Sequence, residues 1–273
     1  MGGSQSIFTY RETKRPIQLE CSLNLTRLFP SGDERDRFEA KWCDFLDSDP
    51  WNRHVYELDG DFLHYRTEQL IPVKRERRPP LLLIFGNPAP HSVAAGMFFA
   101  FQDDGKENRF WKNLLRPVGI LDIAVEDGPP EALNQRRMKR MMELDYASPF
   151  RIGLCVFISM PSAAGGPWSG VAGVQRLLGS KAMAQVESAE RERIIRYARG
   201  FLEPGGVVVA FQKNAWEGLR SEGDPPYSID LAKTGKLVGS LAGMADVPLF
   251  GVPPTRLIGP CRSVLRQFLL EEK

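Results

Sequence analysis

Four short, uninterrupted apolar runs constrain the fold of this chain more than any other feature. They lie at residues 81–85, 153–159, 207–211 and 247–250. Apolar runs of this length are typical of strands that are buried on both faces of a parallel sheet. Helical patterns fall between and after them, at residues 110–115, 130–144, about 182–202 and about 260–270. Strands that alternate with helices predict an α/β fold, a three-layer α/β/α sandwich around a central, mainly parallel four-stranded sheet.

The first 80 residues follow a different pattern. We expect an N-terminal extension at 1–80 and a separate main domain at 81–273. Ser31 and Glu34 have the spacing of a capping box, so the sequence predicts an amphipathic helix that begins there. Two short apolar stretches flank Gly60 and predict a strand, a turn and a second strand.

The charge balance leaves the partner open. The chain has 36 Lys and Arg against 34 Asp and Glu, a formal net charge of +2. Two local basic clusters matter more: one at 74–78, in the linker that ends the extension, and one at 136–140. Each is interpreted either as a solvated surface or as a contact to nucleic-acid phosphates.

Cysteines and histidines do not indicate a metal site. None of the four cysteines has a C-x2-C partner, and the three histidines are scattered, so we expect no metal and no cofactor. Widely spaced cysteines without a readable secretory signal predict reduced thiols and a cytoplasmic location. No apolar stretch approaches the roughly 18 residues of a membrane span, so no membrane partner is expected.

Polar and aromatic residues follow the first apolar run. Ligand sites of parallel sheets form at the carboxyl ends of the strands, so these positions are the first place to look for function. In order, the segment contains Asn87-Pro88-Ala89-Pro90-His91, then Phe99-Ala100, then Asn108-Arg109-Phe110-Trp111. Here the sequence resembles the uracil-DNA glycosylase superfamily. It is closest to the mismatch-specific uracil/thymine DNA glycosylases, whose first motif contains Asn-Pro-Gly, then Phe-Ala, then Asn-Arg-Phe-Trp.

Three later segments keep the order of the same family. Residues 153–162 are similar to its second-strand segment, which ends in Arg-Pro-Thr, and 212–217 to its Gly-Lys-x-Ala-Tyr-Glu. Residues 252–257 stand in the place of its second catalytic motif, in which His or Asn precedes Pro-Ser and a loop that enters DNA. The resemblance covers 81–273 and implies a uracil-DNA glycosylase-like fold.

The resemblance also implies a function. It implies an enzyme that hydrolyses the N-glycosidic bond of a base flipped out of double-stranded DNA. The motifs contain no candidate Schiff-base lysine, so we expect a monofunctional glycosylase without a lyase step, and a monomer is the default expectation for an enzyme with one DNA site. Asn87 would orient the attacking water, and Phe99 would stack on the base. The remaining base-binding positions would be Pro88, Ala89, His91 and Val156. Contacts to the DNA backbone, or a wedge into the duplex, are expected from Ser159, Ser162, Lys213, Arg256 and Leu257.

Two positions depart from the family pattern. Val156 stands where many relatives have Asn or Asp to read the pyrimidine edge, and Val252 where they have His or Asn to stabilise the leaving base. Loss of one such donor costs about 10²–10³ in rate. We therefore expect an unusual or modified pyrimidine as substrate. The superfamily that the chain resembles includes members that act on modified pyrimidines, among them glucosylated hydroxymethylcytosine of phage DNA in a defensive role.

Three other interpretations stay open at this stage. The chain is a uracil/thymine mismatch repair glycosylase, a DNA-binding module without catalysis, or an α/β enzyme that acts on free nucleosides or nucleotides. A phosphate-binding loop of the G-x4-G-K-[ST] type is absent from the sequence. Binding to duplex DNA with strong salt dependence separates the DNA proteins from a nucleosidase.

Overall fold

The computed structural model divides the chain into two compact units. It describes residues 6–12, 18–102, 104–116, 119–123, 127–202 and 205–254, together with positions 260, 262, 263, 266 and 267. The first unit combines residues 1–69, 87–96 and 156–193, and the second combines 70–86, 97–155 and 194–273. The expected boundary at residue 80 does not coincide with this division, because two later segments fold with the N-terminal region.

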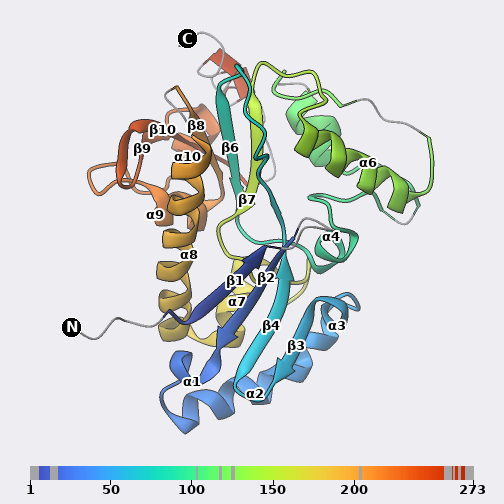
Figure 1. Ribbon diagram of the computed structural model, residues 1–273. Helices are drawn as coiled ribbons and strands as arrows, with labels where there is room; N and C mark the ends of the chain where they lie inside the picture. Colours follow the sequence, from blue (N-terminus) through green and yellow to red (C-terminus); the bar gives the residue numbers. More distant parts are fainter. Residues whose placement is uncertain are drawn as a thin grey trace. The chain divides into compact units, whose positions relative to one another are not determined.

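The first unit is built on a four-stranded antiparallel sheet, drawn in blue and cyan in Figure 1. Its strands are β1 (Phe8–Glu12), β2 (Leu19–Asn24), β3 (Tyr56–Asp59) and β4 (Phe62–Thr67), in the order β1-β2-β4-β3. Its helices are α1 (Leu25–Leu28), α2 (Gly32–Asp47), α3 (Asn52–Val55), α4 (Pro90–Ala95), α7 (Gly170–Leu178) and most of α8 (Ser180–Phe201). Burial alternates along β2 and β4, so one face of the sheet is buried and the other faces solvent.

The helix α2 begins as the sequence predicts. The Ser31 hydroxyl accepts a hydrogen bond from the Glu34 N–H at 3.3 Å, which satisfies an N-terminal amide of the helix. The Glu34 carboxylate contacts Lys181 at 3.1 Å. The expected hairpin is confirmed as β3 and β4, which pair in antiparallel register around Gly60 at φ 52°.

A buried charged network holds the first unit together. Glu190 and Arg193 are 0% and 1% exposed, and Arg193 Nε donates to Glu190 Oε2 at 2.5 Å. The other Glu190 oxygen accepts the Ser159 N–H at 2.6 Å, and Arg193 donates to the Val156 carbonyl oxygen at 2.6 Å. The Tyr10 hydroxyl donates to Glu190 at 3.3 Å. A buried ion pair persists when hydrogen bonds satisfy its remaining atoms, and this pair ties α8 to the segment after residue 155.

Glu68, in the same unit, is a buried carboxyl group whose Oε1 accepts no hydrogen bond within the described part of the chain. Burial raises its pKa well above the usual range. A carboxyl group with a raised native pKa binds its proton more tightly in the folded state. The contribution of Glu68 to the free energy of unfolding is therefore most favourable below the unfolded-state pKa, and it is lost as the pH rises through the native pKa.

We expect Glu68→Gln to raise the free energy of unfolding at pH 7, and the gain to shrink toward zero as the pH falls to about 4. Urea unfolding at pH 4, 5.5 and 7 measures the effect. The exposed Glu57→Gln on β3 is the control and should show no such trend. A gain for Glu68→Gln that is the same at all three pH values would contradict the account.

The second unit is built on a six-stranded sheet of order β5-β7-β6-β8-β10-β9. The strands are β5 (Gln69–Leu70), β6 (Pro80–Phe85), β7 (Arg151–Val156), β8 (Val207–Phe211), β9 (Val238–Leu241) and β10 (Met244–Val252). The strands β6, β8 and β10 pair in parallel, and β9 pairs with β10 in antiparallel register. The four predicted apolar runs thus lie in one sheet of a mixed α/β protein. The expectation of only four, mainly parallel strands is wrong, because β5 and β9 extend the sheet at its two edges.

The helices of the second unit are the π-helical η1 (Phe110–Leu115), α6 (Pro130–Glu143), α9 (Lys213–Leu219), α10 (Ile229–Thr234) and the last turns of α8. Three of these segments, η1, α6 and the end of α8, match the predicted ones, whereas α9 and α10 were not predicted. The expected closing helix at about 260–270 lies mostly outside the described residues. Within the described residues, every helix is too short or too polar for a membrane span.

One arginine of each basic cluster is engaged within the protein. In the linker cluster, Arg78 donates to the carbonyl oxygens of Leu144 and Tyr146 and pairs with Glu76. In the second cluster, Arg137 is 3% exposed and donates to Glu107 at 2.5 Å. These two arginines therefore stabilise the second unit, whereas other basic residues of the clusters, such as Lys74 and Lys139, are exposed.

Candidate functional site

Asn87 is held in a fixed orientation at the start of a loop in the first unit. Its side-chain nitrogen donates to the Met160 carbonyl oxygen at 3.1 Å and to Ser162 Oγ at 2.8 Å. Both amide hydrogens are therefore used, and the amide cannot turn over. Its Oδ1 accepts no hydrogen bond from the described residues, and the side chain is only half-buried. This oxygen is an oriented acceptor that a water molecule can reach.

The segment 159–162 that holds Asn87 is itself fixed from several directions. The Ser162 N–H donates to the Pro88 carbonyl oxygen at 3.1 Å, and Ser162 Oγ donates to the Gly170 carbonyl oxygen at 3.0 Å. The Tyr56 hydroxyl donates to the Pro161 carbonyl oxygen at 2.5 Å. Strand β3 of the N-terminal region thereby positions the loop that carries Asn87.

The two serines expected to contact DNA are buried. Ser159 is 0% exposed, and its hydroxyl contacts Glu190 and, at 2.6 Å, the Tyr65 hydroxyl. Ser162 is 2% exposed and is occupied by Asn87. The expectation of DNA-backbone contacts from Ser159 and Ser162 is therefore wrong for this structure. Their hydrogen-bonding capacity is used to hold the fold and to orient Asn87.

The residues after Asn87 differ in their burial and in the groups that they offer to a ligand. Pro88 is buried, whereas Ala89 is half-exposed and precedes the first turn of α4. The Ala89 N–H has no hydrogen-bond partner among the described residues and can donate to a ligand. His91 packs edge-on against the Trp51 ring, with centroids 5.5 Å apart.

Phe99, in the second unit, has a strained backbone. Its φ of 47° is rare for a residue with a side chain, and such conformations cost about 1–3 kcal/mol and cluster at functional sites. Its neighbours maintain it: the Trp111 Nε1–H donates to the carbonyl oxygens of Phe98 and Phe99 at 3.2 and 3.0 Å. Phe110 stacks on the Phe99 ring at 4.1 Å between centroids. Phe110 and Trp111 of the predicted motif thus act by positioning Phe99, which stays half-exposed.

Aromatic side chains gather where β6 and β8 end. Phe85 stacks on Phe211 with centroids 4.8 Å apart and contacts the Phe99 ring edge-on at 5.1 Å. Phe85 and Phe211 are the last residues of two adjacent parallel strands. The carboxyl ends of β6 and β8 therefore form an apolar floor beside Phe99.

Gln212 is a second strained residue at these strand ends. Its φ of 101° and ψ of 155° lie in a region that is essentially restricted to glycine. Its side chain lies against the backbone of Gly86, where an added Cβ would come within 2.0 Å of Gln212 Oε1. The residues of β6 and β8 are in register up to Ile84 and Ala210, so Gly86 and Gln212 follow the strands side by side.

The remaining predicted positions have mixed outcomes. Val156 and Val252 are 1% and 0% exposed, so the expectation of a base contact from Val156 is wrong for this structure. Their side chains belong to the core and present no surface to a base. Lys213, the first residue of α9, is exposed. Arg256 and Leu257 lie outside the described residues.

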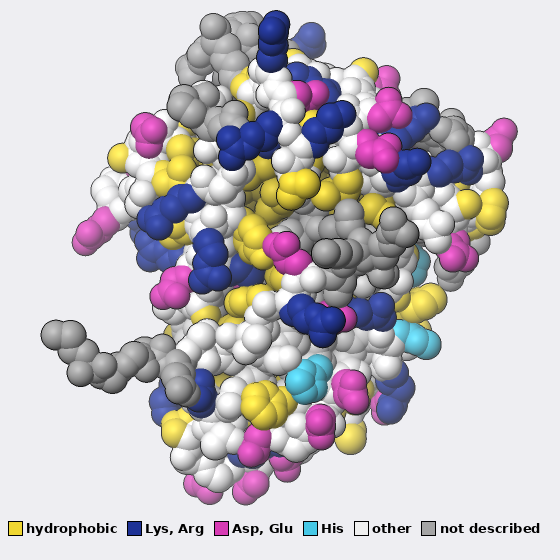
Figure 2. Space-filling view, in the orientation of Figure 1, with side chains coloured by type: hydrophobic (Ala, Val, Ile, Leu, Met, Phe, Trp, Pro, Cys, Tyr) yellow, Lys and Arg dark blue, Asp and Glu magenta, His cyan; other side chains and the backbone are white. Residues whose placement is uncertain are grey.

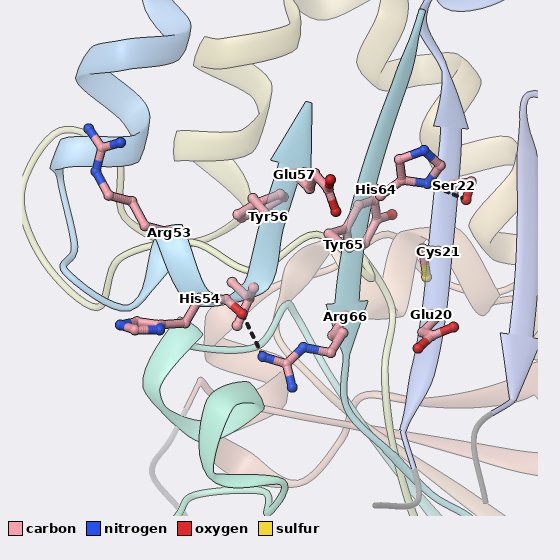
Figure 3. Close-up of a pocket in the computed structure, with 11 residues that line it drawn as sticks. Glu20, Cys21, Ser22, Arg53, His54, Tyr56, Glu57, His64, Tyr65 and Arg66 are labelled. Carbon is pink, nitrogen blue, oxygen red and sulfur yellow. Dashed lines mark hydrogen bonds between the residues drawn. The ribbon is translucent and has the colours of Figure 1, made fainter. Parts of the chain in front are cut away.

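A polar hollow of about 580 Å³ lies on β2, β3, β4 and α3 of the first unit (Figure 3). Ser22 Oγ lies 2.7 Å from His64 Nδ1, and Arg66 donates to the His54 carbonyl oxygen. Figure 2 shows acidic, basic and histidine side chains interspersed over the sheet region, so no one charge dominates. None of the predicted site residues lines the hollow.

The described residues hold no group of three or more His, Cys, Asp or Glu side chains placed to bind a metal ion. A comparison with models of known protein families gives no match, and neither does a search of curated proteins. The side chains and their geometry therefore carry the functional argument.

Sequence reasoning missed three features of the site. The first is Ser162 as the hydrogen-bond partner of Asn87, the second is Gln212, and the third is the Glu190–Arg193 pair. Only Gln212 left a readable signal, because it stands where the family segment that 212–217 resembles has glycine. The other two depend on contacts between residues 31 or more positions apart, such as Ser159 with Glu190.

Proposed function

We propose that this chain is a monofunctional DNA glycosylase of the uracil-DNA glycosylase superfamily, with that family's three-layer α/β/α arrangement. It flips out an unusual or modified pyrimidine of double-stranded DNA and hydrolyses its N-glycosidic bond. A bulky modified cytosine, such as glucosylated hydroxymethylcytosine of phage DNA, is the preferred substrate. The product is an abasic site.

The orientation of Asn87 carries the proposal. Both hydrogens of its amide are bound, by the Met160 carbonyl oxygen and by Ser162 Oγ, so Oδ1 is the atom presented to solvent. An acceptor fixed in this way can hold one hydrogen of a water molecule and direct the water's lone pair. The polar groups of the protein are organised before the substrate arrives, which is what hydrolytic catalysis requires.

The reaction needs few other groups. The sugar develops positive charge as the bond between its anomeric carbon and the base breaks. The oriented water attacks that carbon and loses a proton, and the departing base anion is protonated in its place, so that OH is added to the sugar and H to the base. The base departs with the bonding electrons, and a free amide such as the Ala89 N–H can stabilise its carbonyl oxygen. Phe99 offers a half-exposed ring on which a flipped base can stack.

Two buried valines favour a second candidate, a DNA-binding module without catalysis. Val156 and Val252 provide no hydrogen-bond donor at positions where the related glycosylases have one. The same departures favour a substrate other than uracil if catalysis is retained. A uracil/thymine mismatch glycosylase is the least compatible with them.

A panel of duplexes separates these candidates. It contains uracil, thymine mismatches, hydroxymethylcytosine and glucosylated hydroxymethylcytosine, and alkali converts each abasic site into a strand break. We expect alkali-dependent breaks with a modified cytosine and few with uracil. Breaks confined to uracil or thymine mismatches would support a repair enzyme. Salt-sensitive DNA binding without breaks would support the non-catalytic module.

Phe99→Ala is expected to lower the excision rate by about 5- to 150-fold, because stacking of one base on an aromatic ring contributes about 1–3 kcal/mol. Single-turnover excision measures the change. Phe62, a phenylalanine on β4 that is 42% exposed, provides the control, and Phe62→Ala should leave the rate unchanged. Equal rates for Phe99→Ala and the wild type would contradict a stacking role.

A further inference from the structure

Gln212 has a strained backbone conformation that glycine would adopt without strain. Its φ of 101° and ψ of 155° suit glycine, and a side chain at such a position is strained. It lies directly after β8 and before α9, and its carbonyl oxygen accepts the Trp216 N–H at 3.1 Å. A glycine could make the same backbone hydrogen bond without strain. The side chain must therefore be the reason that this residue is tolerated.

The neighbouring strand makes room for this side chain. Gly86 follows β6, and a Cβ there would lie 2.0 Å from Gln212 Oε1 and 2.6 Å from its Cδ. The amide of Gln212 thus occupies the space that a side chain at 86 would fill. A glycine at 86 and a non-glycine at 212 are complementary, and together they place an amide group at the carboxyl ends of two parallel strands.

The amide of Gln212 is available to a ligand. Neither Oε1 nor Nε2 has a hydrogen-bond partner within the described residues, and the side chain is only half-buried. It lies beside the aromatic floor, since Phe85 and Phe211 immediately precede Gly86 and Gln212. A donor and an acceptor next to apolar rings is the combination that recognises a flat, polar-edged ligand such as a base.

We propose that Gln212 reads the hydrogen-bonding edge of the excised base, an inference that rests on the glycosylase function proposed above. Its amide supplies the donor and acceptor that Val156 lacks. No protein group fixes the amide, so it can turn over and pair with either order of donor and acceptor. The substrate class is therefore any pyrimidine with a donor next to an acceptor on this edge, which includes cytosine derivatives whatever they carry at the 5-position.

Two substitutions test the role. Gln212→Gly removes the amide and relieves the backbone, so we expect at least about 10-fold slower excision together with a melting temperature that is unchanged or about 2–4 °C higher. Gln212→Glu keeps the shape but offers only acceptors at neutral pH. It should therefore change the ratio of excision rates by about 10-fold in favour of cytosine-type bases, which present an exocyclic N–H, over uracil-type bases.

The controls separate this inference from the function on which it rests. The rates are measured on the wild type, Gln212→Gly and Gln212→Glu with matched cytosine-type and uracil-type duplexes, alongside the melting temperature. A wild type that releases no base from any duplex overturns the glycosylase and the reading role together. An active wild type whose rate ratio is unchanged in Gln212→Glu, or a Gln212→Gly variant that only loses stability, overturns the reading role alone.

Discussion

Replacing Asn87 by alanine is expected to lower base excision by about 10²–10⁴-fold while the affinity for duplex DNA stays within a few-fold of the wild type. In the proposed mechanism, the substitution removes the Oδ1 acceptor that would direct the attacking water. It also releases Met160 and Ser162 from their hydrogen bonds, at a cost of about 0.5–1.5 kcal/mol each. Single-turnover excision and an equilibrium DNA-binding titration, measured on the same duplex, report the two quantities separately.

A matched substitution controls for the loss of hydrogen bonds. Asn24 lies in the same unit and accepts the Arg27 N–H at 2.9 Å as the N-cap of α1. Asn24→Ala should lose about 0.5–2 kcal/mol of stability and keep its excision rate. Ser162→Ala, which removes one of the two bonds that orient Asn87, should give an intermediate rate. Excision by Asn87→Ala at the rate of Asn24→Ala would show that Asn87 does not take part.

The largest effect on stability is expected from Arg193→Met, which should destabilise the protein by about 3–5 kcal/mol. Arg193 is 1% exposed and pairs with Glu190, which is fully buried. Removal of the guanidinium leaves the Glu190 carboxylate buried without this counter-charge and removes the hydrogen bond that Arg193 donates to the Val156 carbonyl oxygen. This loss is a large fraction of the free energy of unfolding of a typical folded protein, which is about 5–15 kcal/mol. Urea unfolding measures it.

The same helix offers a control for the loss of an arginine. Arg191 is exposed on α8, so Arg191→Met should change stability by no more than about 0.5 kcal/mol. The double variant Glu190→Leu, Arg193→Met removes both charges and should recover part of the stability lost in Arg193→Met. A double variant that is less stable than Arg193→Met would show that the loss of stability comes from losing the ion pair itself and not from leaving one charge unpaired.

The secondary structure was predictable wherever the apolar pattern was local. The runs at 81–85 and 207–211 became β6 and β8 because every residue in them is buried. Strand β2 was missed although Leu19, Cys21 and Leu23 alternate with more polar residues, a period that is typical of a half-buried strand. The two-residue β5 carries too little sequence to leave a pattern.

The site was predictable only in part, for a physical reason. Asn87 comes just after β6, so its place beyond the carboxyl end of that strand could be read from the chain, whereas Phe99 follows α4 and was predicted only from the family motif. The burial of Ser159 depends on its contact with Glu190, 31 residues away, and no local sequence pattern predicts that contact. The backbone of Gln212 is set by packing against Gly86, which lies on another strand. Positions that depend on such distant contacts need the structure.

Direct detection of a released base tests the central claim most simply. Duplexes containing hydroxymethylcytosine, glucosylated hydroxymethylcytosine or uracil are incubated with the protein. The released small molecules are then separated from the DNA and identified by mass spectrometry. The account predicts one free modified pyrimidine base, an abasic strand that stays intact until alkali is added, and neither product with Asn87→Ala. Duplexes that bind the protein but release no base would contradict the proposed glycosylase activity.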